Sequence, residues 1–148
     1  MVKRDLRKIK VKLYNSNLTT EYRLPLYPSV RAGFPSPASD FLEQDIDLNK
    51  TLIRHPSATF FARVDGNSMK NAGIDDGDLL VVDRSLHYKD NAIVVCYIDG
   101  EFTVKRLKLG EKCHYLVAEN EDYSPIIVTK ENHFIVWGVV ASVIKMFV

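Results

Sequence analysis

The stretch AIVVCYIDGEFTVKRL, residues 92–107, decides the fold of this chain. Its first part, residues 92–98, is a short apolar run, and its second part, residues 101–107, is rich in β-branched side chains. The dipeptide Asp99-Gly100 lies between them. Two such runs joined by Asp-Gly are the strongest short-range signal for a β-hairpin. The sequence therefore predicts two adjacent antiparallel strands here.

The register of this hairpin gives Lys105 a defined place. With a two-residue turn, Ile98 pairs with Glu101, and Val94 then lies opposite Lys105. Apolar neighbours lower the pKa of a lysine because burial disfavours the charged form, and a neutral lysine is able to take a proton from a serine. Since lysines are almost never fully buried, the simpler interpretation is a surface lysine on a strand.

Ser68 is the candidate nucleophile. It lies in the sequence Gly-Asn-Ser-Met, residues 66–69. Such a turn is also ordinary loop chemistry, in which the serine hydroxyl only satisfies backbone groups. If Ser68 attacks a carbonyl, the backbone N–H groups of Ser68 and Asn67 are the candidate donors to the resulting oxyanion.

The rest of the chain predicts a mostly β fold, a compact antiparallel β domain preceded by an extended N-terminal arm. Further strands are expected at residues 59–64, 78–83, 114–118, 126–129 and 134–144. Gly138 marks a bulge in the last of these, and the run 134–140 fits either a core strand or a self-complementary dimer edge.

A short helix is expected over residues 40–52, with Asp40 as its N-cap and Glu43 completing a capping box.

Residues 1–32 differ in charge from residues 33–148. The first part has eight Lys/Arg and two acidic residues, a net charge of +6, whereas the second has 12 Lys/Arg and 17 acidic residues, a net charge of −5. A basic arm is able to bind nucleic acid, but no DNA-reading motif is recognisable here. Alternating basic and apolar residues at 8–13 have the period of a half-buried strand, so docking of the arm on the domain is favoured. The prolines of residues 24–37 disfavour helix at the junction.

Composition excludes several classes of protein. The 148 residues suit one domain, and no stretch approaches the roughly 20 apolar residues of a membrane span. The N-terminus lacks the apolar region of a signal peptide, and two cysteines, of which Cys96 is expected to be a buried thiol, are typical of a reducing compartment. We therefore expect a cytoplasmic protein. Neither the scattered histidines nor the acidic residues 75–78 have metal-ligand spacing, so no metal and no cofactor are expected.

Six motifs resemble those of the LexA/UmuD self-cleaving Ser/Lys peptidase family, and the match is closest to its UmuD-like members. The resemblance covers roughly residues 24–148. The motifs agree in order and spacing: FPSPA at 34–38, IDLN at 46–49, HPSAT at 55–59, GNSM at 66–69, DGDLLVVD at 76–83 and DGEFTVKRL at 99–107. The resemblance implies a LexA/signal-peptidase-like fold, with Ser68 as nucleophile, Lys105 as general base and Ala32-Gly33 as the peptide bond that is cut.

The same resemblance implies a function and partners. Cleavage would remove the arm, residues 1–32, from the peptidase domain, residues 33–148. The shortened protein would serve as a homodimeric accessory subunit of an error-prone translesion DNA polymerase in the SOS response, after stimulation by a recombinase filament on single-stranded DNA. Two alternatives remain: a self-cleaving transcriptional repressor, for which residues 1–32 leave little room for a DNA-reading domain, and an inert dimeric binding module. Direct sequence-specific DNA binding and membrane association are not expected.

Overall fold

A computed structural model describes residues 12–15, 23–26 and 44–148. The described residues fall into two units, one formed by residues 12–15 and 55–148 and the other by residues 23–26 and 44–54. No helix in these described stretches is both long and apolar enough to cross a membrane.

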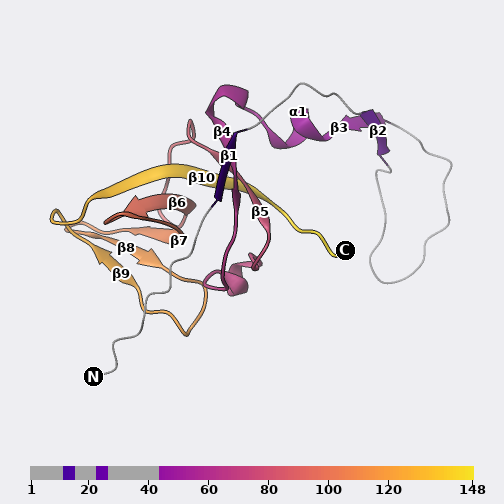
Figure 1. The fold of residues 1–148 in the computed structure, drawn as a ribbon. Helices are drawn as coiled ribbons and strands as arrows, with labels where there is room; N and C mark the ends of the chain where they lie inside the picture. Colours follow the sequence, from indigo (N-terminus) through magenta and orange to yellow (C-terminus); the bar gives the residue numbers. More distant parts are fainter. Residues whose placement is uncertain (1–11, 16–22, 27–43) are drawn as a thin grey trace. The chain divides into compact units, whose positions relative to one another are not determined.

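The larger unit is built on one antiparallel sheet (Figure 1). Its strands are β1 (Lys12–Asn15), β4 (Thr59–Arg63), β5 (Leu79–Asp83), β6 (Ile93–Ile98), β7 (Glu101–Leu109), β8 (His114–Val117), β9 (Ile126–Val128) and β10 (Phe134–Ile144). They are ordered β1-β4-β5-β10-β6-β7-β8-β9. Short 3₁₀ helices lie at Pro56–Ala58 and Lys70–Ala72. The prediction of a mostly antiparallel β fold is confirmed, and so are all five strands expected outside the hairpin.

Strand β10 joins the two halves of this sheet. Its first half pairs with β6 and its second half with β5, so it is a central strand and not an edge (Figure 1). The register shifts between Val136 and Gly138 and again between Val140 and Ser142. The bulge predicted at Gly138 is thus confirmed. Such bulges bend a strand and increase its twist, which lets β10 serve both halves.

The hairpin formed by β6 and β7 has the predicted register. Ile98 pairs with Glu101, and Val94 pairs with Lys105. Asp99 and Gly100 both have positive φ, of 46° and 95°. Asp-Gly is favoured in such a turn because its tight geometry needs positive φ at both central positions.

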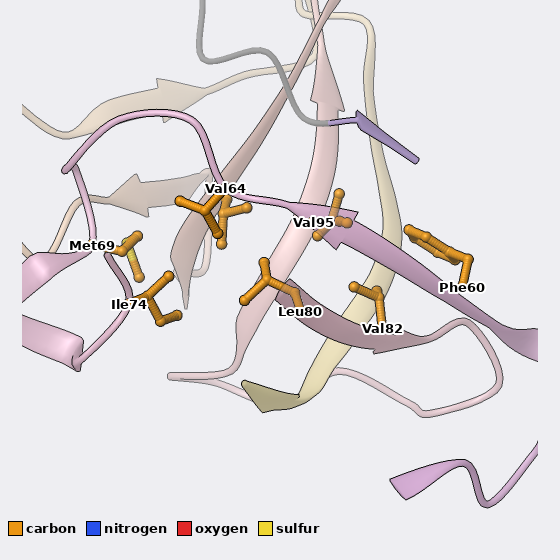
Figure 2. Close-up of a cluster of buried hydrophobic side chains, with 9 residues drawn as sticks. Phe60, Val64, Met69, Ile74, Leu80, Val82 and Val95 are labelled. Atoms are coloured by element: carbon orange, nitrogen blue, oxygen red, sulfur yellow. The ribbon is translucent and has the colours of Figure 1, made fainter. Parts of the chain in front are cut away.

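One buried core draws side chains from strands β4, β5, β6 and β7 and from the loop of residues 64–78 that carries Ser68 (Figure 2). Its buried members are Phe60, Ala62, Val64, Met69, Ile74, Leu80, Val82, Val95 and Val104. Met69 directly follows Ser68 and is only 2% exposed. Burial of a side chain of this size contributes roughly 1.5–3 kcal/mol, so the loop is anchored to the core next to Ser68.

The smaller unit corrects the predicted helix. Residues Gln44–Asp47 form β3, which pairs with β2 (Arg23–Leu26), and helix α1 spans only Leu48–Leu52. Asp47 caps this helix, because its Oδ1 accepts hydrogen bonds from the N–H groups of Asn49 and Lys50 at 3.0 and 3.3 Å. The observed N-cap, Asp47, lies seven positions after the predicted cap, Asp40, which lies outside the described residues.

The predictions for the arm are tested only in part. Strand β1 pairs with β4, so this segment of the arm docks on the larger unit as predicted, but Leu13 is 38% exposed, more than the apolar face of a half-buried strand implies. The extended geometry expected near Pro25 is confirmed by β2. The Ala32-Gly33 bond lies outside the described residues.

Replacement of Gly138 by alanine is expected to lower the free energy of unfolding by about 1–3 kcal/mol. An added Cβ would lie 2.7 Å from Val82 Cγ1 and 3.2 Å from the carbonyl oxygen of Asp83, and Val82 is fully buried. Urea unfolding followed by circular dichroism measures the change. Ala141→Val, at an exposed position of the same strand, is the control, and equal midpoints for both variants would contradict this account of Gly138.

Candidate active site

Ser68 lies in the loop of residues 64–78, which connects β4 to β5. Two backbone hydrogen bonds close this loop at its base. The N–H of Val64 donates to the carbonyl of Asp78 at 2.9 Å, and the N–H of Gly77 donates to the carbonyl of Val64 at 2.8 Å. The ladder of the two strands thus continues into the loop and fixes both of its ends.

The backbone just before Ser68 turns at Gly66. This residue has a φ of 103°, in the region that favours glycine. Its N–H donates to Asp76 Oδ1 at 2.7 Å, so the turn is tied to the returning side of the loop. With Met69 buried on the other side, the backbone at Ser68 is held from both directions, and Ser68 is only 5% exposed.

Lys105 is buried in the middle of β7. It is 4% exposed, although lysines are almost never fully buried. Thr103 and Leu107 lie on the same face of the strand, because successive side chains of a strand alternate. The interpretation of Lys105 as a surface lysine is therefore wrong, and the strand presents its amine to the interior.

The amine of Lys105 meets the hydroxyl of Ser68. The Nζ and Oγ atoms are 3.1 Å apart, across 37 positions of sequence. The same Nζ lies 3.0 Å from Thr103 Oγ1 and 3.1 Å from the carbonyl oxygen of Val104. A neutral amine in this place accepts the proton of the Ser68 hydroxyl, while its own hydrogens donate to the other two oxygens.

Burial lowers the pKa of Lys105 from 10.5 to about 8. The cause is desolvation, which disfavours the charged ammonium. Cys96, on the neighbouring strand β6, opposes this shift only as a thiolate, and burial raises the pKa of Cys96 to about 12. Cys96 is thus a neutral buried thiol, as predicted, over the whole range in which Lys105 titrates.

A second segment, residues 119–123, contacts the loop and was missed in the sequence. The Nδ2 of Asn120 donates to the carbonyl of Asn67 at 2.9 Å, and the hydroxyl of Tyr123 donates to Asn67 Oδ1 at 3.0 Å. The ring of Tyr123 also lies 6.0 Å from Lys105 Nζ. No motif in the sequence pointed to these residues, whereas Thr103 follows from strand alternation around Lys105.

The N–H groups of Asn67 and Ser68 are among the backbone donors closest in sequence to the Ser68 hydroxyl. Within the described part of the chain, no backbone carbonyl accepts a hydrogen bond from the N–H of Asn67 or of Ser68. These are the two groups suggested as oxyanion donors.

Several of the other polar residues singled out in the sequence have structural partners. His55 Nδ1 lies 2.6 Å from Asp83 Oδ2, and Lys145 Nζ lies 2.6 Å from both Asp75 Oδ2 and Asp78 Oδ2. Among the residues that the structure describes, no three His, Cys, Asp or Glu side chains are grouped to hold a metal ion. The arrangement at Ser68 is that of a serine hydroxyl beside a buried amine.

Comparison with known proteins agrees with this arrangement. The family model described as peptidase S24-like matches residues 25–141. The protein MucA of Escherichia coli is 43% identical over 136 residues, which are 89% of this chain and 92% of MucA. The protein ImpA of Shigella flexneri is 55% identical over 89 residues, 60% of this chain and 61% of ImpA. The LexA repressor of Shewanella sp. (strain W3-18-1) is 44% identical over 111 residues, 75% of this chain and 53% of the repressor.

These matches confirm the resemblance drawn from the sequence. The family match spans the Ser68 loop and strand β7, and the mostly antiparallel β fold is that expected from the resemblance. The chain therefore belongs to the peptidase S24-like family.

Proposed function

We propose that this protein is a self-cleaving serine peptidase that cuts its own Ala32-Gly33 bond with Ser68 and Lys105, and that its shortened form is a UmuD-like accessory subunit in SOS mutagenesis. The observation that carries the proposal is the 3.1 Å approach of Lys105 Nζ to Ser68 Oγ, both side chains being buried. A surface lysine beside a serine would remain protonated at neutral pH. Burial gives this amine the neutral fraction that a general base needs.

The reaction begins when neutral Lys105 takes the hydroxyl proton of Ser68. Ser68 Oγ then attacks the carbonyl carbon of Ala32, and the N–H groups of Ser68 and Asn67 donate to the oxyanion. The ammonium of Lys105 returns its proton to the amine of Gly33, which leaves as a new N-terminus. Water hydrolyses the ester between Ser68 and Ala32, with Lys105 again as the base.

The substrate segment is part of the chain, so its effective concentration at the site is high. Gly33 adds no side chain on the leaving side of the bond, which permits close approach of the nucleophile. Regulation would then control whether residues 32 and 33 dock at Ser68, because diffusion of a separate substrate to the site is not needed. In this proposal, a recombinase filament on single-stranded DNA favours the docked arrangement.

Cleavage would also change the charge of the protein. Removal of residues 1–32 takes away a net charge of +6 and leaves an acidic domain of net charge −5. The family resemblance supports a cytoplasmic homodimer that joins the catalytic subunit of an error-prone translesion polymerase. This role is favoured over that of a transcriptional repressor, since the match covers 92% of MucA but only 53% of the LexA repressor. An inert binding module would not cleave at all.

Ser68→Ala and Lys105→Ala are each expected to abolish self-cleavage while the protein stays folded, because each removes one half of a two-part nucleophile. The double variant should be no slower than either single variant. Electrophoresis of purified protein after alkaline incubation measures the loss of intact chain. Ser57→Ala and Lys112→Ala, both at exposed positions, are the matched controls. Cleavage of Lys105→Ala at the wild-type rate would remove Lys105 as the base.

The cleavage rate is expected to rise with pH as a single-proton curve whose midpoint lies near the Lys105 pKa of about 8. Because the folded pKa is lowered, the neutral base gains population at a lower pH than an exposed lysine would allow. First-order rates across roughly pH 6 to 10, with Ser68→Ala as blank and circular dichroism as the folding check, give the profile. A cleavage rate that does not change with pH would refute the role of Lys105 as the base, even if Ser68→Ala abolishes cleavage.

Gly33→Val is expected to slow cleavage at least about tenfold, because a β-branched side chain crowds the leaving side of the bond. Glu111→Val, which places valine at an exposed loop position, should cleave at the wild-type rate. Mass spectrometry of the wild-type product should show a domain that begins at Gly33. A different new N-terminus would overturn the assignment of the cut to Ala32-Gly33.

A further inference from the structure

Residues 119–123, between β8 and β9, form a clamp on the loop that carries Ser68. Three hydrogen bonds join the two segments. Asn120 Nδ2 donates to the carbonyl of Asn67 at 2.9 Å, the Tyr123 hydroxyl donates to Asn67 Oδ1 at 3.0 Å, and the N–H of Asn71 donates to the carbonyl of Glu119 at 2.8 Å. Two of the three bonds end on Asn67, the residue immediately before the nucleophile.

Asn120 is built into the clamp in one orientation. It is 4% exposed, and its Oδ1 accepts a hydrogen bond from the N–H of Asp122 at 3.0 Å. Its backbone carbonyl accepts from the N–H of Tyr123 at 3.1 Å. Since Oδ1 faces a donor, the amide group must present Nδ2 toward Asn67, and both ends of the side chain are used.

The geometry of the peptide bond carries this contact to the reaction centre. The carbonyl of Asn67 and the N–H of Ser68 belong to one planar trans peptide unit and point in opposite directions. The carbonyl of Asn67 accepts the bond from Asn120 Nδ2 at 2.9 Å and a longer one from the N–H of Lys70 at 3.3 Å, and by fixing the carbonyl these bonds fix the direction of the Ser68 N–H. A donor on the carbonyl also polarises the unit, which strengthens the N–H as a donor.

We propose that Asn120, supported by Tyr123, is a positioning residue that aims the N–H of Ser68 at the oxyanion formed during self-cleavage. The inference rests on the proposed function, because it assumes that Ser68 attacks a carbonyl. Asn120 acts through the peptide of Asn67 and Ser68 and touches neither the substrate nor the reacting oxygen. Its contribution is made in the transition state, where a fixed donor meets developing charge without reorganisation.

The titratable groups around Lys105 make the pH profile a discriminating measurement. Cys96 faces it from β6 as a neutral thiol, Tyr123 presents its ring 6.0 Å from Nζ, and Glu119 is paired with Arg106. An aiming role lowers the rate plateau at high pH and leaves the midpoint in place. A merely structural role loosens the loop, admits water to Lys105 and moves the midpoint upward, toward the ordinary lysine pKa.

The test compares Asn120→Leu with Asn132→Leu in the full chain. Both changes remove an asparagine that donates through Nδ2 and accepts a backbone N–H through Oδ1, but Asn132 bonds Asp99 and Thr129, away from Ser68. We expect Asn120→Leu to lower the plateau at least about tenfold with an unchanged midpoint, since loss of a whole oxyanion donor costs roughly 100- to 1000-fold. Asn132→Leu should keep the wild-type plateau.

Tyr123→Phe provides a second variant that removes a single hydroxyl and keeps the ring near Lys105. It should lower the plateau by a smaller factor at the same midpoint, and it decides the matter if Asn120→Leu fails to fold. If the folded Asn120→Leu variant reaches the wild-type cleavage rate at high pH, the inference is overturned. If that variant does not fold, a wild-type rate plateau in Tyr123→Phe overturns it. A raised midpoint of the pH profile in either variant would also overturn it. Absence of Ser68-dependent cleavage in the wild-type chain would instead defeat the proposed function.

Discussion

The burial of one amine is the constraint on which the candidate site depends. Lys105 must lie where water is excluded, because only desolvation lowers its pKa to about 8. A carboxylate beside it would undo this effect by favouring the charged form. In the described part of the chain, its near partners are instead the uncharged oxygens of Ser68, Thr103 and Val104.

The sheet supplies the rigid frame that this constraint requires. Lys105 is a residue of β7, held between β6 and β8, while Ser68 belongs to the loop between β4 and β5. These two halves are joined by β10, whose bulges permit one strand to pair with both (Figure 1). A candidate site with one residue on a strand and the other on a loop between two strands is held more precisely than one built on loops alone. The buried Met69 completes the frame by anchoring the loop to the core (Figure 2).

A buried amine and an oriented backbone donor solve two separate problems of acyl transfer. The first concerns the proton, which needs an acceptor that is neutral near the working pH. The second concerns the developing negative charge, which needs donors already in place. In the proposed mechanism the first task belongs to Lys105 of β7 and the second to the loop of Asn67 and Ser68, which is hydrogen-bonded to residues 119–123.

The sequence by itself determined the local features of this protein. The Asp99-Gly100 turn set the register of the hairpin and so the partner of Lys105, because a two-residue turn leaves no freedom. The local sequence predicted the wrong start for α1, because Asp40 and Asp47 are both acceptable N-caps. Only the pairing of β3 with β2 excludes the earlier start. Tertiary structure alone decided the contact of Ser68 with Lys105, 37 positions away, and that of Asn67 with Asn120, 53 positions away. Such contacts depend on how strands are ordered in the sheet, and no local pattern of residues encodes that order.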